Sequence, residues 1–124
     1  VVGLGECADP NECKAVADLG IDMLAAGIGN IHGKYPANWP GLRFDVLESI
    51  KEKVGDMPLV LHGGTGISPD DFVRCSKTGI KKINIATATF DSVENSVRSC
   101  YNDKSIKGYY DLQAAESGCV VRRS

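Results

Sequence analysis

Two histidines occur in the 124 residues, and both stand in the same local context. His32 and His62 each follow an apolar run and each precede a glycine. The runs, residues 21–28 and 58–61, are too short for buried helices and favour buried strands. Both imidazoles would then project from the carboxyl ends of strands, where α/β sheets and barrels place their active sites.

Neutral imidazole is a natural zinc ligand, and neighbouring parallel strands lie about 4.8 Å apart, so two such side chains can converge on one ion. His32 and His62 are therefore candidate metal ligands, with a purely structural role for the pair as an equal alternative. A catalytic zinc normally has three protein ligands. The sequence has no third histidine, and Cys75 and Cys100, on predicted outer helices, are not expected to replace it.

A glycine-rich turn, residues 63–66, follows His62 and leads into a helix opened at Ser68. Glycines let backbone N–H groups approach an anion, the Thr65 hydroxyl adds a donor, and a helix start adds positive potential. This turn is a candidate phosphate site. The alternative is a tight connection without a ligand.

Asn84 opens the third polar segment, residues 84–87, on an expected strand at 82–87. A buried amide needs a hydrogen-bond partner, and at the mouth of a strand the partner can be a substrate hydroxyl or phosphate. An Asn84 side chain bonded to a loop is the alternative.

Helix signals alternate with these strands. Asp9 with Pro10, Asp45 with Glu48, and Ser68 with Pro69 are the expected helix starts, and glycines at 20, 55 and 79 are the expected ends. A last amphipathic helix would use Phe90, Val93 and Val97.

With residues 1–5 as a partial strand, about four βα units are expected, and their apolar strands should be buried on both faces of a parallel sheet. Half of a TIM (β/α)8 barrel fits this pattern, because a whole barrel needs about 250 residues. A doubly wound sheet is the competitor. The chain also begins with Val and not Met, which suggests a fragment.

Composition narrows the class of protein. Hydrophobic residues make up 43% and charged residues 24%, and the net charge is −2, so a soluble globular protein is expected, with neither nucleic acid nor membrane as a partner. The five cysteines form no C-x-x-C pair, and no signal peptide or long apolar run is present. Reduced thiols in the cytoplasm are the prediction.

Three segments together, residues 29–35, 59–66 and 82–87, resemble class II (zinc-dependent) fructose- and tagatose-bisphosphate aldolases in order and spacing. The resemblance covers about residues 1–100 and implies that residues 1–124 are the C-terminal half of an aldolase barrel, with 101–124 poorly assigned. It implies zinc at His32 and His62. The implied residues for the dihydroxyacetone phosphate half of the substrate are Gly33, Gly63, Gly64, Thr65, Asn84, Ile85, Ala86 and Thr87.

The implied activity is cleavage and formation of a ketose 1,6-bisphosphate, with dihydroxyacetone phosphate and glyceraldehyde 3-phosphate as the other side of the reaction. Zinc would act as a Lewis acid on the triose. A monovalent cation is a second candidate cofactor, and the full-length enzyme is expected to be a homo-oligomer, a dimer or tetramer. Fructose and tagatose bisphosphate both remain open as substrates.

The sequence also lacks several residues that the family uses for catalysis. Its proton-donating Asp and third zinc-binding His have no match here, and Glu6 is the candidate remnant of a shortened acidic catalytic loop. The helix expected after Tyr110 is cut off or altered, so the chain alone should not complete a catalytic cycle. Two alternatives stay open: a Schiff-base aldolase using Lys34, and a non-catalytic phosphate-binding or assembly remnant.

Overall fold

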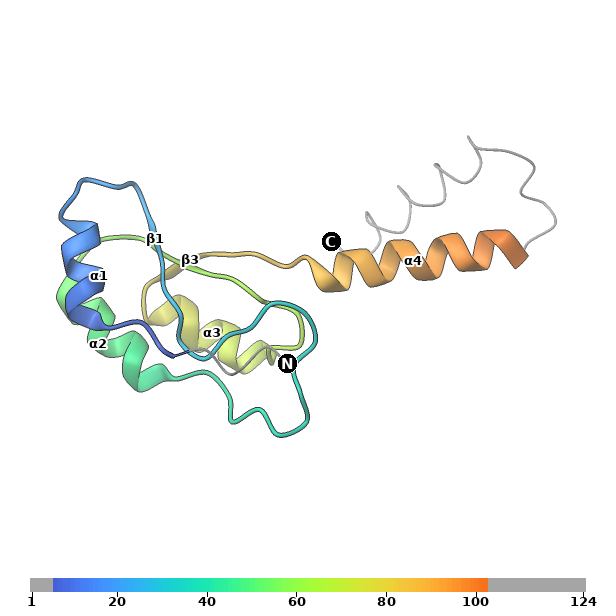
Figure 1. Ribbon diagram of the computed structural model, residues 1–124, viewed down its shortest axis with the longest axis horizontal. Helices are drawn as coiled ribbons and strands as arrows, with labels where there is room; N and C mark the ends of the chain where they lie inside the picture. The colour runs from blue at the N-terminus through green and yellow to red at the C-terminus, as the bar shows by residue number, and fades with distance from the viewer. Residues whose placement is uncertain (1–5, 103–124) are drawn as a thin grey trace. The chain divides into compact units, whose positions relative to one another are not determined.

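The structure is a computed structural model that describes residues 6–102 (Figure 1). The chain divides into two units, one ending at Ile85 and one beginning at Ala86. The first contains α1 (Pro10–Ala17), β1 (Leu24–Ala25), α2 (Phe44–Val54), β2 (Leu59–Leu61), α3 (Pro69–Lys77) and β3 (Ile80–Ile83). The second contains α4 (Thr87–Asn102), the predicted last helix.

The three strands of the first unit form one parallel sheet in the order β1-β2-β3. Leu24 pairs with Leu59, and Leu61 pairs with Ile83. Consecutive strands joined by helices are the repeating unit of a barrel, so the predicted βα alternation is confirmed for residues 6–102. The partial strand predicted at residues 1–5 lies outside the described residues, as does the segment after 102.

Two of the helix starts are held by the side chains that the sequence indicates. The Asp9 carboxylate accepts hydrogen bonds from the N–H groups of Asn11 at 2.7 Å and Glu12 at 3.3 Å. The Ser68 hydroxyl accepts one from the N–H of Asp71 at 3.2 Å. Each cap precedes a proline at the first helical position, where the missing N–H has no helical partner to lose.

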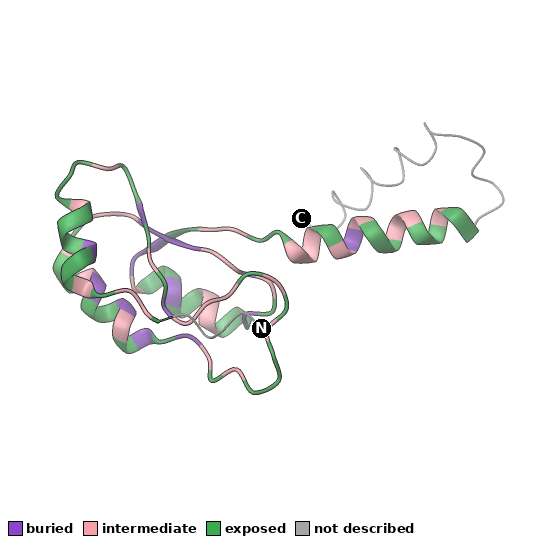
Figure 2. Cartoon of the chain, viewed as in Figure 1, coloured by how far each residue is buried: buried purple, intermediate pink, exposed green. Residues whose placement is uncertain are grey.

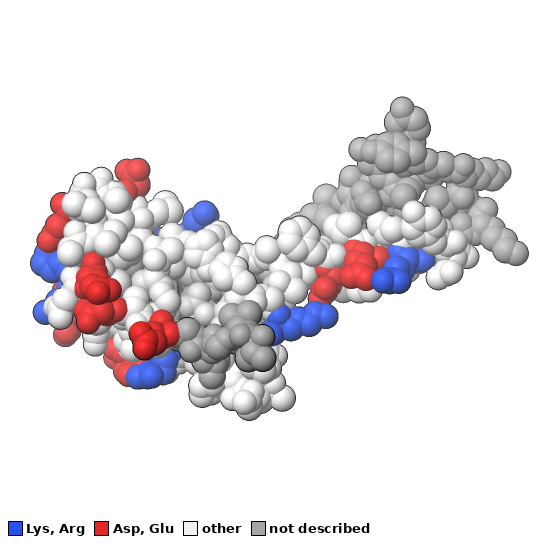
Figure 3. Space-filling view, in the orientation of Figure 1, with Lys and Arg blue, Asp and Glu red and all other residues white. Residues whose placement is uncertain are grey.

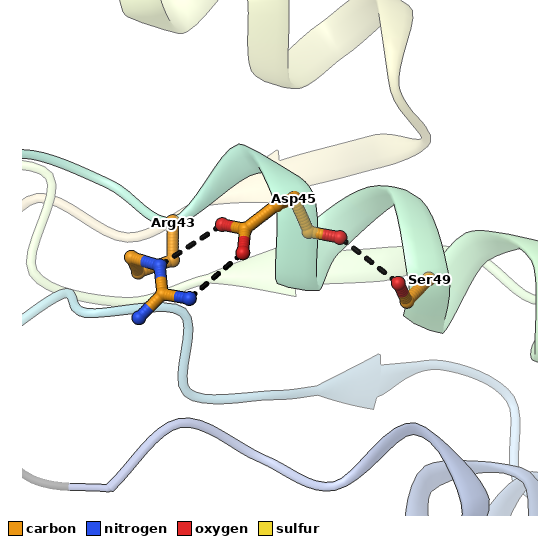
Figure 4. Close-up of polar contacts among 3 residues, drawn as sticks. All are labelled: Arg43, Asp45 and Ser49. Atoms are coloured by element: carbon orange, nitrogen blue, oxygen red, sulfur yellow. Dashed lines mark hydrogen bonds and ion pairs between the residues drawn. The ribbon is translucent and has the colours of Figure 1, made fainter.

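The predicted N-cap of α2, Asp45, is wrong. Arg43 occupies that position, and no side chain caps the helix. Asp45 instead accepts two hydrogen bonds from the Arg43 guanidinium, at 2.9 Å and 2.7 Å, while its carbonyl accepts from the Ser49 hydroxyl (Figure 4). A paired carboxylate in the first turn has satisfied oxygens, so it does not need to turn back onto the backbone. Gly55 ends the helix as predicted.

The Arg43 pair predicts an acid sensitivity. Its hydrogen bonds lower the pKa of Asp45 from 3.8 to about 2. A carboxyl whose pKa is lower in the folded chain stabilises the fold above pH 3.8, and this contribution is lost as the pH falls toward 2. Urea unfolding midpoints measured between these pH values should fall less for Asp45→Asn than for the unmodified chain. Parallel pH profiles would contradict the pair.

Two strands are shorter or shifted relative to prediction. The strand expected at 21–28 is only Leu24–Ala25, because the chain beyond it turns to other partners: the carbonyl of Gly27 accepts from the N–H of Ala8 at 2.8 Å. The strand expected at 82–87 is β3, Ile80–Ile83. Asn84 therefore follows a strand, and Thr87 begins α4.

In the first unit the core lies between the sheet and α1, α2 and α3, and α1 and α2 pack against each other. Figure 2 shows buried residues gathered on the strands and along one side of α2. All three residues of β2 are buried, as expected for a central parallel strand. β3 departs from that expectation, because Lys81 and Lys82 are exposed.

Acidic and basic side chains are interspersed on the face drawn in Figure 3. Ion pairs one helical turn apart occur on two helices, Lys14 with Asp18 on α1 and its C-cap and Arg98 with Glu94 on α4. On this face the described residues form no broad basic field of the kind that binds nucleic acid. Within residues 6–102 every helix is too short or too polar to cross a membrane.

Candidate functional site

The two histidine rings lie next to each other at the carboxyl ends of β1 and β2. His62 directly follows β2, and His32 lies in the loop between β1 and α2. Their ring centroids are 5.6 Å apart, with 35° between the ring planes. His32 is exposed and His62 is half-buried, so the pair sits at the surface end of the sheet with access for a ligand.

This separation suits a shared metal ion. Nitrogens about 2 Å from a tetrahedral zinc place the centres of two imidazole rings about 5 Å apart. The observed 5.6 Å is close to that value. Within residues 6–102, however, no group of three or more His, Cys, Asp or Glu side chains is arranged to hold a metal. Among the described residues, the site therefore presents two candidate ligands, fewer than the three of a usual catalytic zinc.

Cys75 does not supply the third ligand. It is fully buried in the core of the first unit, and burial raises the pKa of its thiol. Metals bind the thiolate, so a thiol held neutral in an apolar environment is a poor ligand. Cys100 belongs to the second unit. Cys7, Cys13, Cys75 and Cys100 are all free thiols.

Side chains from the loops after β1 and β3, the two neighbours of β2, form hydrogen bonds with His62. The Nδ2 of Asn84 lies 3.1 Å from His62 Nδ1, and the Nδ2 of Asn30 donates to the carbonyl of His62 at 3.0 Å. Asn30 is itself fixed, because its Oδ1 accepts from the N–H of Ile28 at 2.9 Å. Ring and backbone of His62 are therefore oriented separately, by the loops after β3 and β1.

The Asn84 contact fits two proton arrangements, because amide orientation and histidine tautomer are interdependent. If Asn84 donates, His62 Nδ1 is unprotonated and Nε2 carries the proton. If the amide presents its oxygen instead, Nδ1 donates and the lone pair at Nε2 is free for a metal. The second arrangement is the usual one for a metal-binding histidine, whose other nitrogen donates to a fixed acceptor.

Close approach between loops accounts for the glycines after His62. Gly63 has φ +69°, and a Cβ there would lie 2.0 Å from the carbonyl oxygen of Ile31. A Cβ on Gly64 would lie 2.8 Å from Ile85 and 2.9 Å from Ile83. The Gly64 N–H donates to the carbonyl of Asn84 at 3.0 Å, so that N–H is already engaged. The loop that joins β2 to α3 is thus packed closely against the loop after β1 and the end of β3, whether or not it also holds an anion.

The other predicted site residues are distributed unevenly. Gly33 follows His32 and has φ +97°, with open space where a Cβ would be. Thr65 is half-buried, and Ile85 is exposed. Ala86 and Thr87 belong to the second unit. The backbone of Glu6 lies beside Gly27, and its side chain is exposed, so its catalytic role stays a prediction.

Lysines give limited support to the Schiff-base alternative. Lys34 is exposed, whereas a Schiff-base lysine is usually activated by desolvation or by another cation. Lys82 does not start its strand as predicted. It lies within β3, paired with Val60.

Asn30 and Tyr35 lie in the motif at residues 29–35, and the sequence predicted no role for either of them. The structure places both against the loop of His62: Asn30 bonds the carbonyl of His62, and the Tyr35 hydroxyl donates to the carbonyl of Gly63 at 2.7 Å. The ring of Trp39, the single tryptophan, lies against that of Tyr35 at an interplanar angle of 41°, and the sequence predicted no role for it either. Their only sequence signal is their position close to His32.

Consecutive parallel strands joined by helices, with the paired histidines at the carboxyl end of the sheet, are the arrangement of part of a (β/α)8 barrel and of the end where such barrels place their sites. The model of the family "Fructose-bisphosphate aldolase class-II" matches residues 3–120, and the chain belongs to this family. The resemblance seen in the sequence is thereby confirmed.

Relatives and solved structures agree. A fructose-bisphosphate aldolase of Mycoplasma genitalium is 45% identical over 123 residues, 99% of this chain and 41% of the relative. One of Streptococcus pyogenes serotype M1 is 45% identical over 98 residues, 79% of this chain and 33% of the relative. The chain thus spans well under half the length of these proteins.

The crystal structure of the YdjI aldolase from Escherichia coli K12 matches with a TM-score of 0.78 and 29% identity, over 98% of this chain and 42% of that one. A putative fructose-1,6-bisphosphate aldolase from Coccidioides immitis matches with a TM-score of 0.72 and 26% identity, over 96% and 42%. The predicted fold, part of an aldolase barrel, is confirmed by these similarities.

Proposed function

We propose that this chain supplies two metal ligands, His32 and His62, to the active site of a class II ketose-bisphosphate aldolase. Its loop at residues 63–66 would bind a phosphate group of the substrate. The observation that carries the proposal is the 5.6 Å separation of the two rings at adjacent strand ends. The substrate would be a ketose 1,6-bisphosphate, fructose or tagatose, with dihydroxyacetone phosphate and glyceraldehyde 3-phosphate as products.

The neighbouring elements suit that task. The loop at 63–66 and the N-terminus of α3 follow His62 directly, so a phosphate bound there would bring the rest of the substrate to the imidazoles. Asn84 contacts His62 and lies within reach of the same space. A bound zinc ion would supply Lewis-acid polarisation of a substrate carbonyl.

Several finer assignments belong to the proposal as well. Zinc is the metal we favour, since neutral imidazoles suit it, and a monovalent cation is a second candidate. The free thiols support a cytoplasmic location. A homo-oligomeric state is proposed for the full-length enzyme. Glu6 is retained as a candidate remnant of the acidic catalytic loop.

Zinc affinity tests the proposal that this chain carries two of the metal ligands and lacks the third. Competition with a fluorescent chelator should give one weak site in the 124-residue chain, with a dissociation constant on the order of 1 µM or weaker, because one of three ligands is missing. His32→Ala and His62→Ala should each abolish it, while Lys53→Ala, a change of an exposed residue on α2, should not.

Three results would contradict this proposal: nanomolar zinc affinity of the chain alone, aldol cleavage by the chain alone, and zinc binding that survives both histidine substitutions. Binding of inorganic phosphate without any zinc binding would favour the non-catalytic remnant. Borohydride trapping of substrate on Lys34 would establish the Schiff-base alternative.

A further inference from the structure

The Tyr35 hydroxyl lies between the backbones of the two histidine loops. It accepts a hydrogen bond from the N–H of Ile31 at 3.2 Å and donates one to the carbonyl of Gly63 at 2.7 Å. Ile31 immediately precedes His32, and Gly63 immediately follows His62. One oxygen atom therefore joins the chain next to the first imidazole to the chain next to the second.

We propose that Tyr35 is a positioning residue that sets the distance between the rings of His32 and His62. Its place in catalysis rests on the proposed function, in which the two rings share one ion. The bonds run in one direction, from the amide N–H through the hydroxyl to the carbonyl, so each polarises the next. Both are satisfied at one spacing of the loops, and a change of spacing breaks at least one.

Close packing around the hydroxyl supports this role. A Cβ on Gly63 would lie 3.2 Å from the Tyr35 hydroxyl oxygen, and one on Gly66 would lie 3.4 Å from the Tyr35 ring. The tyrosine thus fills the contact between its own loop and the glycine loop. Removing the hydroxyl leaves the Gly63 carbonyl and the Ile31 N–H without this partner, which loosens the contact at the point nearest the imidazoles.

The ring that carries the hydroxyl is itself anchored. Its centroid lies 4.0 Å from that of Trp39, and the Trp39 indole N–H donates to the carbonyl of Gly29 at 2.8 Å. Burial raises the pKa of Tyr35, so the hydroxyl keeps the proton it donates at neutral pH. Tyr35 is therefore held at a fixed place as a neutral donor.

Asn30 makes a second bridge between the same loops, to the carbonyl of His62. The two bridges act on consecutive carbonyl groups, those of His62 and Gly63. Losing the Tyr35 bond alone leaves the Asn30 bridge in place. Because the Asn30 bridge still joins the loops, Tyr35→Phe should leave the chain folded. Because the Tyr35 bond is lost, the spacing of the two rings should change.

The test compares Tyr35→Phe with the unmodified chain by NMR, with ¹³C-labelled histidine. The chain has two histidines, so two sets of ring signals arise and their mutual cross-relaxation reports the ring separation. In Tyr35→Phe the metal-free cross-peak should weaken, and zinc affinity should fall about tenfold, as for loss of an outer orienting contact. Tyr101→Phe removes the same hydroxyl from an exposed position on α4 and should change neither quantity.

An unchanged cross-peak in Tyr35→Phe would overturn the positioning role, whatever the zinc affinity. If the cross-peak weakens in Tyr35→Phe but neither the variant nor the unmodified chain binds zinc, the positioning role is supported and the proposed function is contradicted. If Tyr35→Phe does not fold, Trp39→Phe keeps the hydroxyl but removes the indole bond to Gly29. It should weaken the cross-peak to a smaller degree, and an unchanged peak there would also overturn the role.

Discussion

Replacing Gly63 by alanine is expected to lower the free energy of unfolding by about 2–5 kcal/mol, the sum of about 1–2 kcal/mol of backbone strain and about 1–3 kcal/mol of overpacking. The φ of +69° is a left-handed conformation that side chains rarely adopt, and the new Cβ would lie 2.0 Å from the carbonyl oxygen of Ile31. That oxygen belongs to backbone, so it moves only if the loop of His32 moves with it. Urea unfolding followed by Trp39 fluorescence measures the loss.

Gly20→Ala is the matched control. Gly20 has φ +85°, and nothing lies within 4 Å of the place where its Cβ would be. This substitution should cost about 1–2 kcal/mol, the backbone strain without the clash. If Gly63→Ala is no more destabilising than Gly20→Ala, the loops of the two histidines do not approach each other as described.

Leu61→Ala is expected to destabilise the chain by about 2–5 kcal/mol, the range for deleting a fully buried leucine side chain. Leu61 is 0% exposed, lies on the central strand and pairs with Ile83. A cavity at this point also leaves β2 poorly packed directly before His62. Urea unfolding should show the loss of stability, and the histidine ring signals should broaden.

Val73→Ala provides the comparison for Leu61. Val73 is 54% exposed on α3, and its truncation should change the free energy of unfolding by less than about 0.5 kcal/mol. Equal effects of the two substitutions would mean that β2 is not the centre of the core.

Features set by neighbours in sequence were predictable. The caps at Asp9 and Ser68 depend on bonds to residues two or three positions away, so the local pattern contains the whole interaction. The place of His62 was predictable for a similar reason, because a short apolar strand ending at a glycine fixes where its side chain emerges.

Other features were not predictable. Asp45 has the spacing of a capping box with Glu48, but the Arg43 guanidinium, only two positions away, takes up its carboxylate in two charge-assisted hydrogen bonds. The end of β3 depends on pairing with β2 and not on its own apolar run, which continues to Ile85. Propensity therefore placed the strand too late.

The bonds that shape the candidate site are the least visible in the sequence. Asn30 reaches the carbonyl of His62 across 32 positions, and Tyr35 reaches Gly63 across 28. Asparagine and tyrosine in loops have many other roles, so neither residue type announces a contact between loops. Only the folded sheet, with adjacent strand ends, brings these groups within hydrogen-bond distance.

The central claim is that His32 and His62 can share one ion, and an NMR titration with zinc tests it most directly. As zinc is added, the ring signals of both histidines should shift along one binding curve with a stoichiometry of one ion per chain, and in His62→Ala the His32 signals should no longer respond. A response from one histidine only, or two curves with separate midpoints, would contradict the shared site.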